Sequence, residues 1–385
     1  MAQRHERALK ISQDLIKCPS VTPKDEGVFA VLETALAELG FECHVKTFEE
    51  DGLEPVTNIF AKIGKGNPHF CFAGHVDVVP VGDEDAWTQP PFGATIHDKA
   101  LYGRGASDMK GAVGAFIAAT EAFLDAHSPF HGTISLLIAG DEEDPLIAGT
   151  KHMLKWMDKE HLIPDMCLVG EPTNPTQLGE MIKIGRRGSV TGYLTVTGLQ
   201  GHAAYPHLAD NPVPKIVDIL NTVKSIDFDE GSEFFQPTNL EIVSIDTGNT
   251  ANNVIPAKCT AMLNVRFNDL HSSQDIINHI THAADKTGHK YAIEYHISGE
   301  SFLTEPSKFS ETVLNAIQTA IGRKPDMTTT GGTSDARFIS QYCPVVEFGG
   351  VGESMHKVDE HIRISDLNDL TDIYLNVLKS IYNSP

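Results

Sequence analysis

Five histidine and acidic residues stand out as candidate metal ligands, because each follows an apolar run or lies in a glycine-rich turn. They are His75, Asp108, Glu143, Glu171 and His356. Histidine and carboxylate ligands without thiolates are typical of hydrolytic metal sites rather than of structural zinc sites. Two histidines, two terminal carboxylates and one shared carboxylate would give each of two cations three protein ligands. The sequence therefore predicts a two-metal site that hydrolyses its substrate.

The first cluster, Gly74-His75-Val76-Asp77, ends an apolar run over residues 70–79. Ligands of open α/β sheets gather at the carboxyl ends of strands, so a polar pair is well placed there. Residues two apart share one face of a strand. His75 could therefore bind a metal while Asp77 fixes the tautomer of an imidazole. Taken alone, the pair could also be two hydrogen-bonded polar residues at a strand end.

Asp108 lies in a turn bracketed by glycines, Gly103 to Gly111, directly before an expected helix over residues 111–123. A carboxylate in this position could cap the helix. Its two oxygens also suit it to bridge two cations. The spacing leaves both interpretations open.

Four consecutive acids, Asp141 to Asp144, follow a strand-like run over residues 133–139. Neighbouring carboxylates repel one another unless a cation or solvent reduces the repulsion, and a solvated acidic loop is the ordinary explanation. Adjacent side chains diverge, however, so Glu143 could bind metal while Glu142 faces the substrate as a base. A metal-polarised water needs a proton acceptor beside it, which favours this division.

Glu171 and His356 repeat the same setting downstream of apolar runs over residues 166–169 and 344–348. The recurrence of one pattern at separate places makes coincidence improbable. It therefore favours the metal interpretation of all five residues over the separate local alternatives.

The surrounding pattern predicts two domains, as expected for a chain of 385 residues. Apolar strand-like runs alternate with helical stretches up to Arg187, which indicates an α/β domain with a substantially parallel sheet. Half-exposed strands and two helices then follow, which favours an inserted α+β domain. We place the catalytic domain at 1–187 and 299–385, and the inserted domain at 188–298.

The chain contains 30 basic and 52 acidic residues and has a formal net charge of −22. Nucleic acid and anionic membranes both require a basic face, so we expect neither as a partner. Cysteines are scattered without a CxxC pair, which argues against a thiolate zinc site. The N-terminal MAQRHERALK lacks the apolar core of an export signal, which predicts a cytoplasmic protein.

Three basic residues, Lys183, Arg186 and Arg187, fall within five positions of this acidic chain. Arginine can grip a carboxylate with two parallel hydrogen bonds, so this basic island suits an anionic small-molecule substrate. Ordinary pairing with surface carboxylates is the alternative.

The motifs GHVDVVP, GRGASDMKG, GDEED and GEPT, with the C-terminal His356, resemble the co-catalytic zinc aminoacylase and carboxypeptidase family in the same order over nearly the full chain. The resemblance implies a zinc-peptidase-like catalytic domain with a mixed central sheet flanked by helices, and a homodimer formed through the inserted α+β domain. It also implies two Zn²⁺ per subunit, with Co²⁺ able to substitute at one site. It assigns His75 and Glu171 to one ion, Glu143 and His356 to the other, with Asp108 bridging. Asp77 would be the partner of His75, and Glu142 the general base.

Gly201-His202-Ala203-Ala204-Tyr205-Pro206 in the inserted domain resembles the family element GH(A/S)xxP. In the family this histidine reaches across the dimer and stabilises the oxyanion, which implies that role for His202. A loop residue without a role is the alternative.

Four further segments, GRRGS, NNVIP, NVRF and GGTSDARF, are similar to family members that hydrolyse N-succinyl-LL-2,6-diaminopimelate in lysine and diaminopimelate biosynthesis. One segment, residues 350–355, departs from the pattern expected before the metal histidine. Acetylornithine deacetylation, dipeptide hydrolysis, or a catalytically silent protein that binds amino-acid derivatives remain alternatives. The residues implied to hold the substrate are Lys183, Arg186, Ser189, Tyr205, Asn252, Asn253, Arg266, Gly332 and Thr333.

Overall fold

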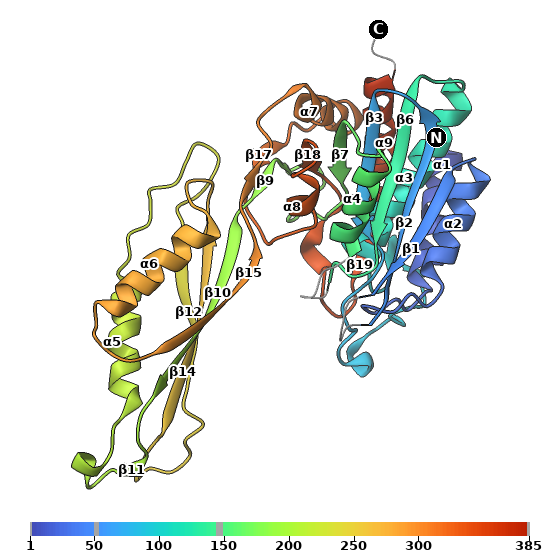
Figure 1. Cartoon of the computed structure of the whole chain (residues 1–385). Coiled ribbons are helices and arrows are strands. Elements are labelled where there is room, and N and C mark those ends of the chain that lie inside the picture. The colour runs from blue at the N-terminus through green and yellow to red at the C-terminus, as the bar shows by residue number, and fades with distance from the viewer. Residues whose placement is uncertain (1, 50–53, 144–148, 383–385) are drawn as a thin grey trace. The chain divides into compact units, whose positions relative to one another are not determined.

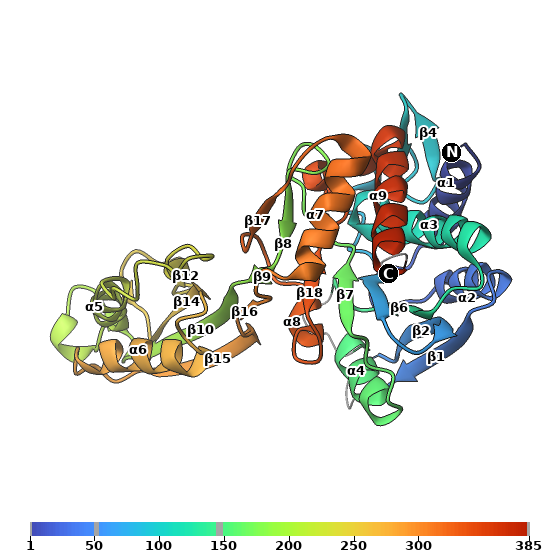
Figure 2. The same ribbon diagram turned by 90° about the horizontal axis from the view of Figure 1, so that it is seen from above.

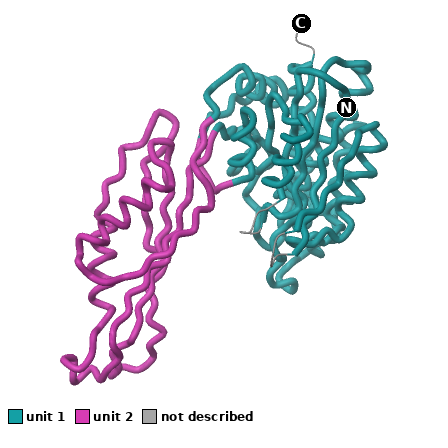
Figure 3. Tube along the Cα trace, in the orientation of Figure 1, with its two compact units in different colours: residues 1–184, 304–328, 334–385 teal, residues 185–303, 329–333 magenta. Residues whose placement is uncertain are grey.

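The computed structural model describes residues 2–49, 54–143 and 149–382. The chain divides into two compact units (Figure 3). Unit 1 comprises residues 1–184, 304–328 and 334–385, and unit 2 comprises residues 185–303 and 329–333. Asp144 of the acidic run lies outside the described residues.

Unit 1 is built on an eight-stranded mixed sheet with the order β1-β2-β6-β3-β7-β18-β8-β17 (Figure 1). The neighbours β6, β3, β7 and β18 run parallel, whereas β1 and β2 pair antiparallel at one edge. This arrangement confirms the predicted mixed central sheet. The strands are β1 (Glu42–Phe48), β2 (Val56–Lys65), β3 (His69–His75), β6 (Gly132–Ala139), β7 (Met166–Val169), β8 (Met181–Lys183), β17 (Asp326–Thr328) and β18 (Val345–Glu347).

Helices cover both faces of this sheet (Figure 2). One layer contains α1, α3, α7 and α9, which pack against one another, and α4 packs with α8 on the other face. The strands β3 and β6 are buried at every position as a result, which explains their unbroken apolar sequences. The helices are α1 (Ala2–Ile16), α2 (Val28–Glu38), α3 (Gly111–His127), α4 (Gly149–Lys159), α7 (Lys308–Ile321), α8 (Ala336–Ile339) and α9 (Ile364–Tyr382).

Aromatic side chains fill the space between β3 and the helices behind it. Phe72 of β3 stacks on Phe116 of α3 with ring centroids 4.3 Å apart, and Tyr374 of α9 meets both rings edge-on. The buried Tyr374 hydroxyl donates to the Phe348 carbonyl at 2.9 Å, so its polar atom is satisfied. This packing fixes the strand that ends in His75.

A small three-stranded sheet joins two segments that are distant in sequence. It consists of β4 (Thr95–His97), β5 (Ala100–Tyr102) and β19 (His361–Arg363), with β5 in the centre. The short helical turns η1 (Glu84–Ala86), η2 (Ala106–Lys110) and η4 (Gly352–Ser354) lie in the connections of unit 1. The chain therefore passes from β5 directly into the glycine-rich turn, and enters β19 directly after the segment that carries His356.

Unit 2 contains a four-stranded antiparallel sheet with the order β12-β14-β10-β15 and two helices on one face. Its strands alternate because inward residues such as Val190, Leu194 and Val265 pack under the helices, while Tyr193 on the other face is 50% exposed. The elements are β10 (Gly188–Thr197), β12 (Asn239–Asp246), β14 (Lys258–Phe267), β15 (Ala292–Gly299), α5 (Pro212–Lys224) and α6 (Ser273–Asp285), with the short elements β9 (Gly185–Arg186), β11 (Gly201–His202), β13 (Val254–Ile255), β16 (Phe302–Leu303) and η3 (Pro206–Leu208).

Two sequence expectations differ from the structure in extent. The apolar run 70–79 predicts a long strand, but β3 ends at His75, and Val78 instead forms a bridge with Val21. The antiparallel pair β1 and β2 was not expected from the alternation of strands and helices. Among the described residues, no helix is both long enough and apolar enough to cross a membrane.

His69 at the start of β3 should make the fold sensitive to mild acid. Its Nε2 lies 2.8 Å from the Ser135 hydroxyl, and burial lowers the pKa of His69 below its ordinary value of 6.5. The unfolded chain therefore binds a proton at a higher pH than the folded chain, so folding stability falls as the pH drops below about 6.5.

We expect His69→Gln to weaken this dependence. Urea midpoints of metal-free wild-type and variant protein at pH 7.5 and 5.5 measure it, and the drop should be smaller for the variant. An equal drop in both proteins would show that His69 contributes nothing to it.

Candidate active site

Three of the five candidate ligands come from neighbouring parallel strands of unit 1. His75 is the last residue of β3, while Glu143 and Glu171 follow the ends of β6 and β7. Because β6, β3 and β7 run parallel, their carboxyl ends meet at the same edge of the sheet. The sheet therefore brings together three residues that are far apart in sequence.

Asp108 lies between two imidazoles. Its Oδ1 is 3.2 Å from Nε2 of His75, and its Oδ2 is 3.3 Å from Nε2 of His356. The helix α3 begins after it, but no side chain caps that helix. The capping interpretation of Asp108 is thus not supported. Its backbone leaves the helical region at φ −126°, and the peptide bond to Met109 is cis.

Each histidine also faces a carboxylate of its own. Glu171 Oε1 lies 3.6 Å from Nε2 of His75, and Glu143 Oε1 lies 3.0 Å from Nε2 of His356. We call the first group, with Oδ1 of Asp108, half-site A, and the second, with Oδ2, half-site B. His356 does not directly follow β18, as its sequence setting suggested, because the helical turn η4 intervenes.

The pKa shifts in this cluster show that it favours positive charge at its two histidines. Burial opposes protonation of His75, but its hydrogen bonds to Asp108 and Asp77 raise its pKa well above 6.5. Hydrogen bonds to Asp108 and Glu143 raise the pKa of His356 to about 10. Burial opposes ionisation of Asp108, yet the two imidazoles hold its pKa below the ordinary value. Metal cations would supply this charge in place of protons, so the donor set fits a two-cation site.

Asp77 connects His75 to the acidic loop. The side chain of Asp77 is 1% exposed, and its Oδ1 lies 3.5 Å from Nδ1 of His75. The backbone N–H groups of Glu142 and Glu143 donate to its two oxygens at 3.2 and 3.1 Å, and the Thr22 hydroxyl donates at 2.6 Å. The Asp77 backbone carbonyl lies closer to Nδ1 of His75, at 3.0 Å, so Asp77 orients the imidazole through both groups while its carboxylate fixes the backbone of both loop acids.

Glu142 lies in the same cluster. Its carboxylate groups with His75 and Glu171, with the contacting atoms within 4.8 Å of one another. Burial raises the pKa of Glu142 well above 4.5, and the charge of Glu171 adds to that shift. A carboxyl group with a raised pKa beside candidate metal ligands is suited to accept a proton and return it.

Two residues of this region were not found from the sequence. Glu360 is 0% exposed and accepts hydrogen bonds from the backbone of Asp108 and from the Arg104 guanidinium. Burial raises the pKa of Glu360, and its bond to Arg104 opposes that shift. No sequence signal separates Glu360 from the other acids of so acidic a chain, and Arg104 was noted only as a member of the glycine-rich motif.

Unit 2 places the predicted substrate residues in two groups. The first surrounds the short sheet of β11 and β13, where His202 pairs with Val254, and Ala203 N–H donates to the Asn253 carbonyl at 2.8 Å. The rings of His202 and Tyr205 lie 5.6 Å apart, and both side chains are exposed. This group consists of His202, Tyr205, Asn252 and Asn253.

The second group lies around β9 and the start of β10. Arg186 Nη1 donates to the Gly332 carbonyl at 3.0 Å, and Ser189 is directly opposite Arg266 in the pairing of β10 and β14. Figure 1 shows β9 and β11 at opposite ends of unit 2, so unit 2 does not bring its predicted residues into one place. This group consists of Arg186, Ser189, Arg266, Gly332 and Thr333.

Lys183 is the one predicted substrate residue that belongs to unit 1. It ends β8, is 5% exposed, and its Nζ donates to Thr328 Oγ1 at 2.9 Å. In this position its ammonium group is held against the sheet.

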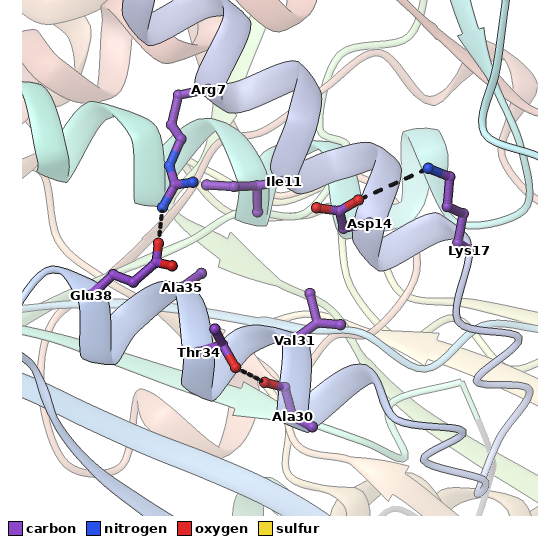
Figure 4. A pocket seen from close by; sticks show the side chains of 9 residues that line it. All are labelled: Arg7, Ile11, Asp14, Lys17, Ala30, Val31, Thr34, Ala35 and Glu38. Atoms are coloured by element: carbon purple, nitrogen blue, oxygen red, sulfur yellow. Dashed lines mark hydrogen bonds and ion pairs between the residues drawn. The ribbon is translucent and has the colours of Figure 1, made fainter.

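A groove of about 480 Å³ between α1 and α2 is separate from these residues (Figure 4). Its charged side chains pair among themselves, with Arg7 2.8 Å from Glu38 and Lys17 3.9 Å from Asp14. It contains none of the predicted site residues, and its paired charges show no preference for a ligand of either sign.

Comparison with solved structures agrees with this architecture. An M20 family metallo-carboxypeptidase from Sulfolobus solfataricus superposes with a TM-score of 0.78 at 19% identity, covering 97% of this chain and 98% of that one. A dinuclear metal binding M20 peptidase of Bacillus subtilis gives a TM-score of 0.69 at 15% identity, covering 100% of both chains. These similarities confirm the fold.

Sequence relatives are much closer. A succinyl-diaminopimelate desuccinylase of Rhodospirillum centenum is 53% identical over 96% of both chains. One of Parvibaculum lavamentivorans is 50% identical over 97% of this chain and 95% of that relative. Residues 71–380 match the profile of peptidase family M20/M25/M40. The chain therefore belongs to peptidase family M20/M25/M40.

Proposed function

We propose that this protein hydrolyses N-succinyl-LL-2,6-diaminopimelate to succinate and LL-2,6-diaminopimelate. The observation that carries this proposal is the 53% identity, over 96% of both chains, to a relative named succinyl-diaminopimelate desuccinylase. The cluster of unit 1 supports it, since it combines a two-cation donor set with a carboxyl group suited to proton transfer.

We assign one Zn²⁺ to half-site A and one to half-site B. The donor set of histidine nitrogen and carboxylate oxygen supports zinc, and also tolerates Co²⁺, which we expect to substitute at one site. When bound, the two ions supply Lewis acidity that polarises the scissile carbonyl and makes a water molecule acidic.

Within the protein, Glu142 acts as the general base and acid. It accepts the proton of the attacking water and later gives it to the leaving amine, so that one water is consumed for each amide cleaved. Asp77 holds the Glu142 backbone N–H and lies beside the His75 imidazole, so it keeps base and ligand in a fixed relation. A raised pKa of Glu142 favours this return of the proton.

Residues of unit 2 would hold the carboxylates of the substrate, with Arg186 and Arg266 as the charged donors. Within the described part of the chain, Arg266 has no carboxylate within ion-pairing distance, and its Nε donates instead to Asn264 at 3.1 Å.

We also propose a homodimer through unit 2 in which His202 of a second copy stabilises the oxyanion. The separation of the His202 group from the Arg266 group within unit 2 supports a contribution from two copies. The cytoplasmic location stays a prediction.

The substrate assignment predicts a strong preference for a succinyl over an acetyl group. Succinate carries a second carboxylate, and a hydrogen bond to a charged group contributes about 1.5–3 kcal/mol, or roughly tenfold to a hundredfold. With zinc-loaded protein, kcat/KM for N-succinyl-LL-2,6-diaminopimelate should exceed that for N-acetylornithine by at least this factor. Faster cleavage of acetylornithine or of a dipeptide would indicate another specificity, and cleavage of none would indicate a silent binding protein.

Glu142→Gln should abolish proton transfer and leave the metal ligands intact. Loss of a general base typically reduces a rate by about 10²–10⁴-fold, and we expect a drop in kcat of this size. Metal content by elemental analysis should remain at the wild-type value. If turnover survives, the proton acceptor is another group.

Asp108→Asn should lower metal occupancy at both half-sites, because an amide has only one oxygen and carries no charge to share between two cations. Elemental analysis after dialysis against limiting zinc measures the occupancy. Asp98→Asn is the matched control, since the Asp98 side chain is 84% exposed and lies outside the cluster. Unchanged zinc binding by Asp108→Asn would exclude Asp108 as the bridge.

A further inference from the structure

Glu360 is a fully buried carboxylate whose oxygens bind the segment that carries Asp108. Its Oε1 accepts the backbone N–H groups of Ser107 and Asp108 at 3.0 and 3.1 Å, and its Oε2 accepts from Arg104 Nη1 at 2.8 Å. Both side chains of the Glu360–Arg104 ion pair are at most 3% exposed. A buried charge pair of this kind is costly to break, so it holds the attached backbone firmly.

Arg104 extends the same connection to the loop of His356. Its Nη1 also donates to the Lys357 carbonyl at 3.1 Å, one residue beyond His356, and its Nη2 donates to the Pro80 carbonyl at 3.2 Å. The guanidinium lies 5.1 Å from the centre of the Trp87 ring, which supports its orientation. One ion pair therefore fixes the backbone of Asp108 and the backbone next to His356.

The His356 loop needs such support. His356 and Asp359 have φ values of +61° and +58°, in the left-handed region that residues other than glycine rarely adopt. A backbone in this region persists where the surrounding contacts determine it. Directly after this loop the chain forms β19, which pairs with β5. The Gly103 N–H donates to the Glu360 carbonyl at 2.9 Å. Glu360 thus stands where the segments of the two ligands meet.

Half-site A depends less on this connection. His75 ends a fully buried central strand, and Glu171 closely follows another, so only Asp108 is shared with the Glu360–Arg104 pair. In half-site B, both Asp108 and His356 are attached to segments that the pair holds. A disturbance of the pair would displace two ligands of half-site B but one ligand of half-site A.

We propose that Glu360 and Arg104 are positioning residues that set the affinity of half-site B for its metal ion. This inference rests on the two-cation part of the proposed function and is independent of the substrate. Neither residue contacts the reacting atoms in this role. They act through the backbone of Asp108 and of the His356 loop.

The test is a titration of the metal-free full-length protein with Zn²⁺ by calorimetry, together with Co²⁺ absorption spectra. Glu360→Gln preserves the size of the side chain but removes the charge that Arg104 requires. We expect the ion at half-site B to lose affinity by about 10–100-fold, as for other partners of metal ligands, and the ion at half-site A to lose much less, because only one of its ligands depends on the pair. The Co²⁺ spectrum of the ion at half-site B should change. Excess zinc should restore kcat without a change in KM.

The matched control is Asp229→Asn in unit 2. Asp229 is also a carboxylate that holds a loop, accepting the N–H groups of Gly231 and Thr238 at 2.7 and 3.2 Å, but it lies outside the cluster. Its loss should lower the melting temperature and leave both metal affinities unchanged. Arg104→Lys is the second variant, since lysine keeps the charge but lacks the planar guanidinium whose two Nη atoms reach two carbonyls. It should show the same selective loss, and it decides the outcome if Glu360→Gln does not fold.

Two results would overturn the inference. Wild-type affinity for both ions in the variants would show that the pair only stabilises the fold. Equal weakening of both ions would show that it does not act on half-site B in particular. Failure of the proposed activity is distinguishable from both, because a protein that binds two ions selectively but does not cleave the succinylated substrate would contradict only the substrate assignment.

Discussion

The carboxylate of Asp108 faces one imidazole with each oxygen, at 3.2 Å from His75 and 3.3 Å from His356. This shared position imposes the main constraint on unit 1, because three separate parts of the chain must meet within a few ångströms. The central sheet supplies His75, the glycine-rich turn supplies Asp108, and the loop before β19 supplies His356. Much of the surrounding structure serves to keep these three in place against the repulsion of neighbouring acids.

The sheet and the loops meet this constraint by different means. Parallel strands packed between helical layers place His75 through the hydrophobic effect, which needs no specific partner. The turn buries Ala106 and Met109, and it and the His356 loop are held in addition by directional bonds, above all by the Glu360–Arg104 ion pair.

The candidate metal ligands could be identified from the sequence because each lies beside a local signal, an apolar run or a cluster of glycines. The α/β layering and the parallel strands followed from the alternation of strands and helices, whereas the antiparallel pair β1 and β2 did not. The pairing of His75 with Glu171 and of His356 with Glu143 came only from the family resemblance, since it depends on packing between distant segments that no local pattern records. Glu360 was not identified from the sequence for a related reason. Its importance comes from its burial against Arg104, and its local sequence resembles that of many exposed acids. The helical turn η4 between β18 and His356 is likewise too short to give a periodic pattern in the sequence.

The carboxylate of Asp77 touches the imidazole of His75 and holds the backbone N–H groups of Glu142 and Glu143. The proposed base Glu142 therefore cannot be moved, for example to admit a bulkier acyl group, without also moving the imidazole of His75. Any change that shifts the acidic loop is transmitted to a ligand of half-site A, and any retuning of that ligand shifts the base.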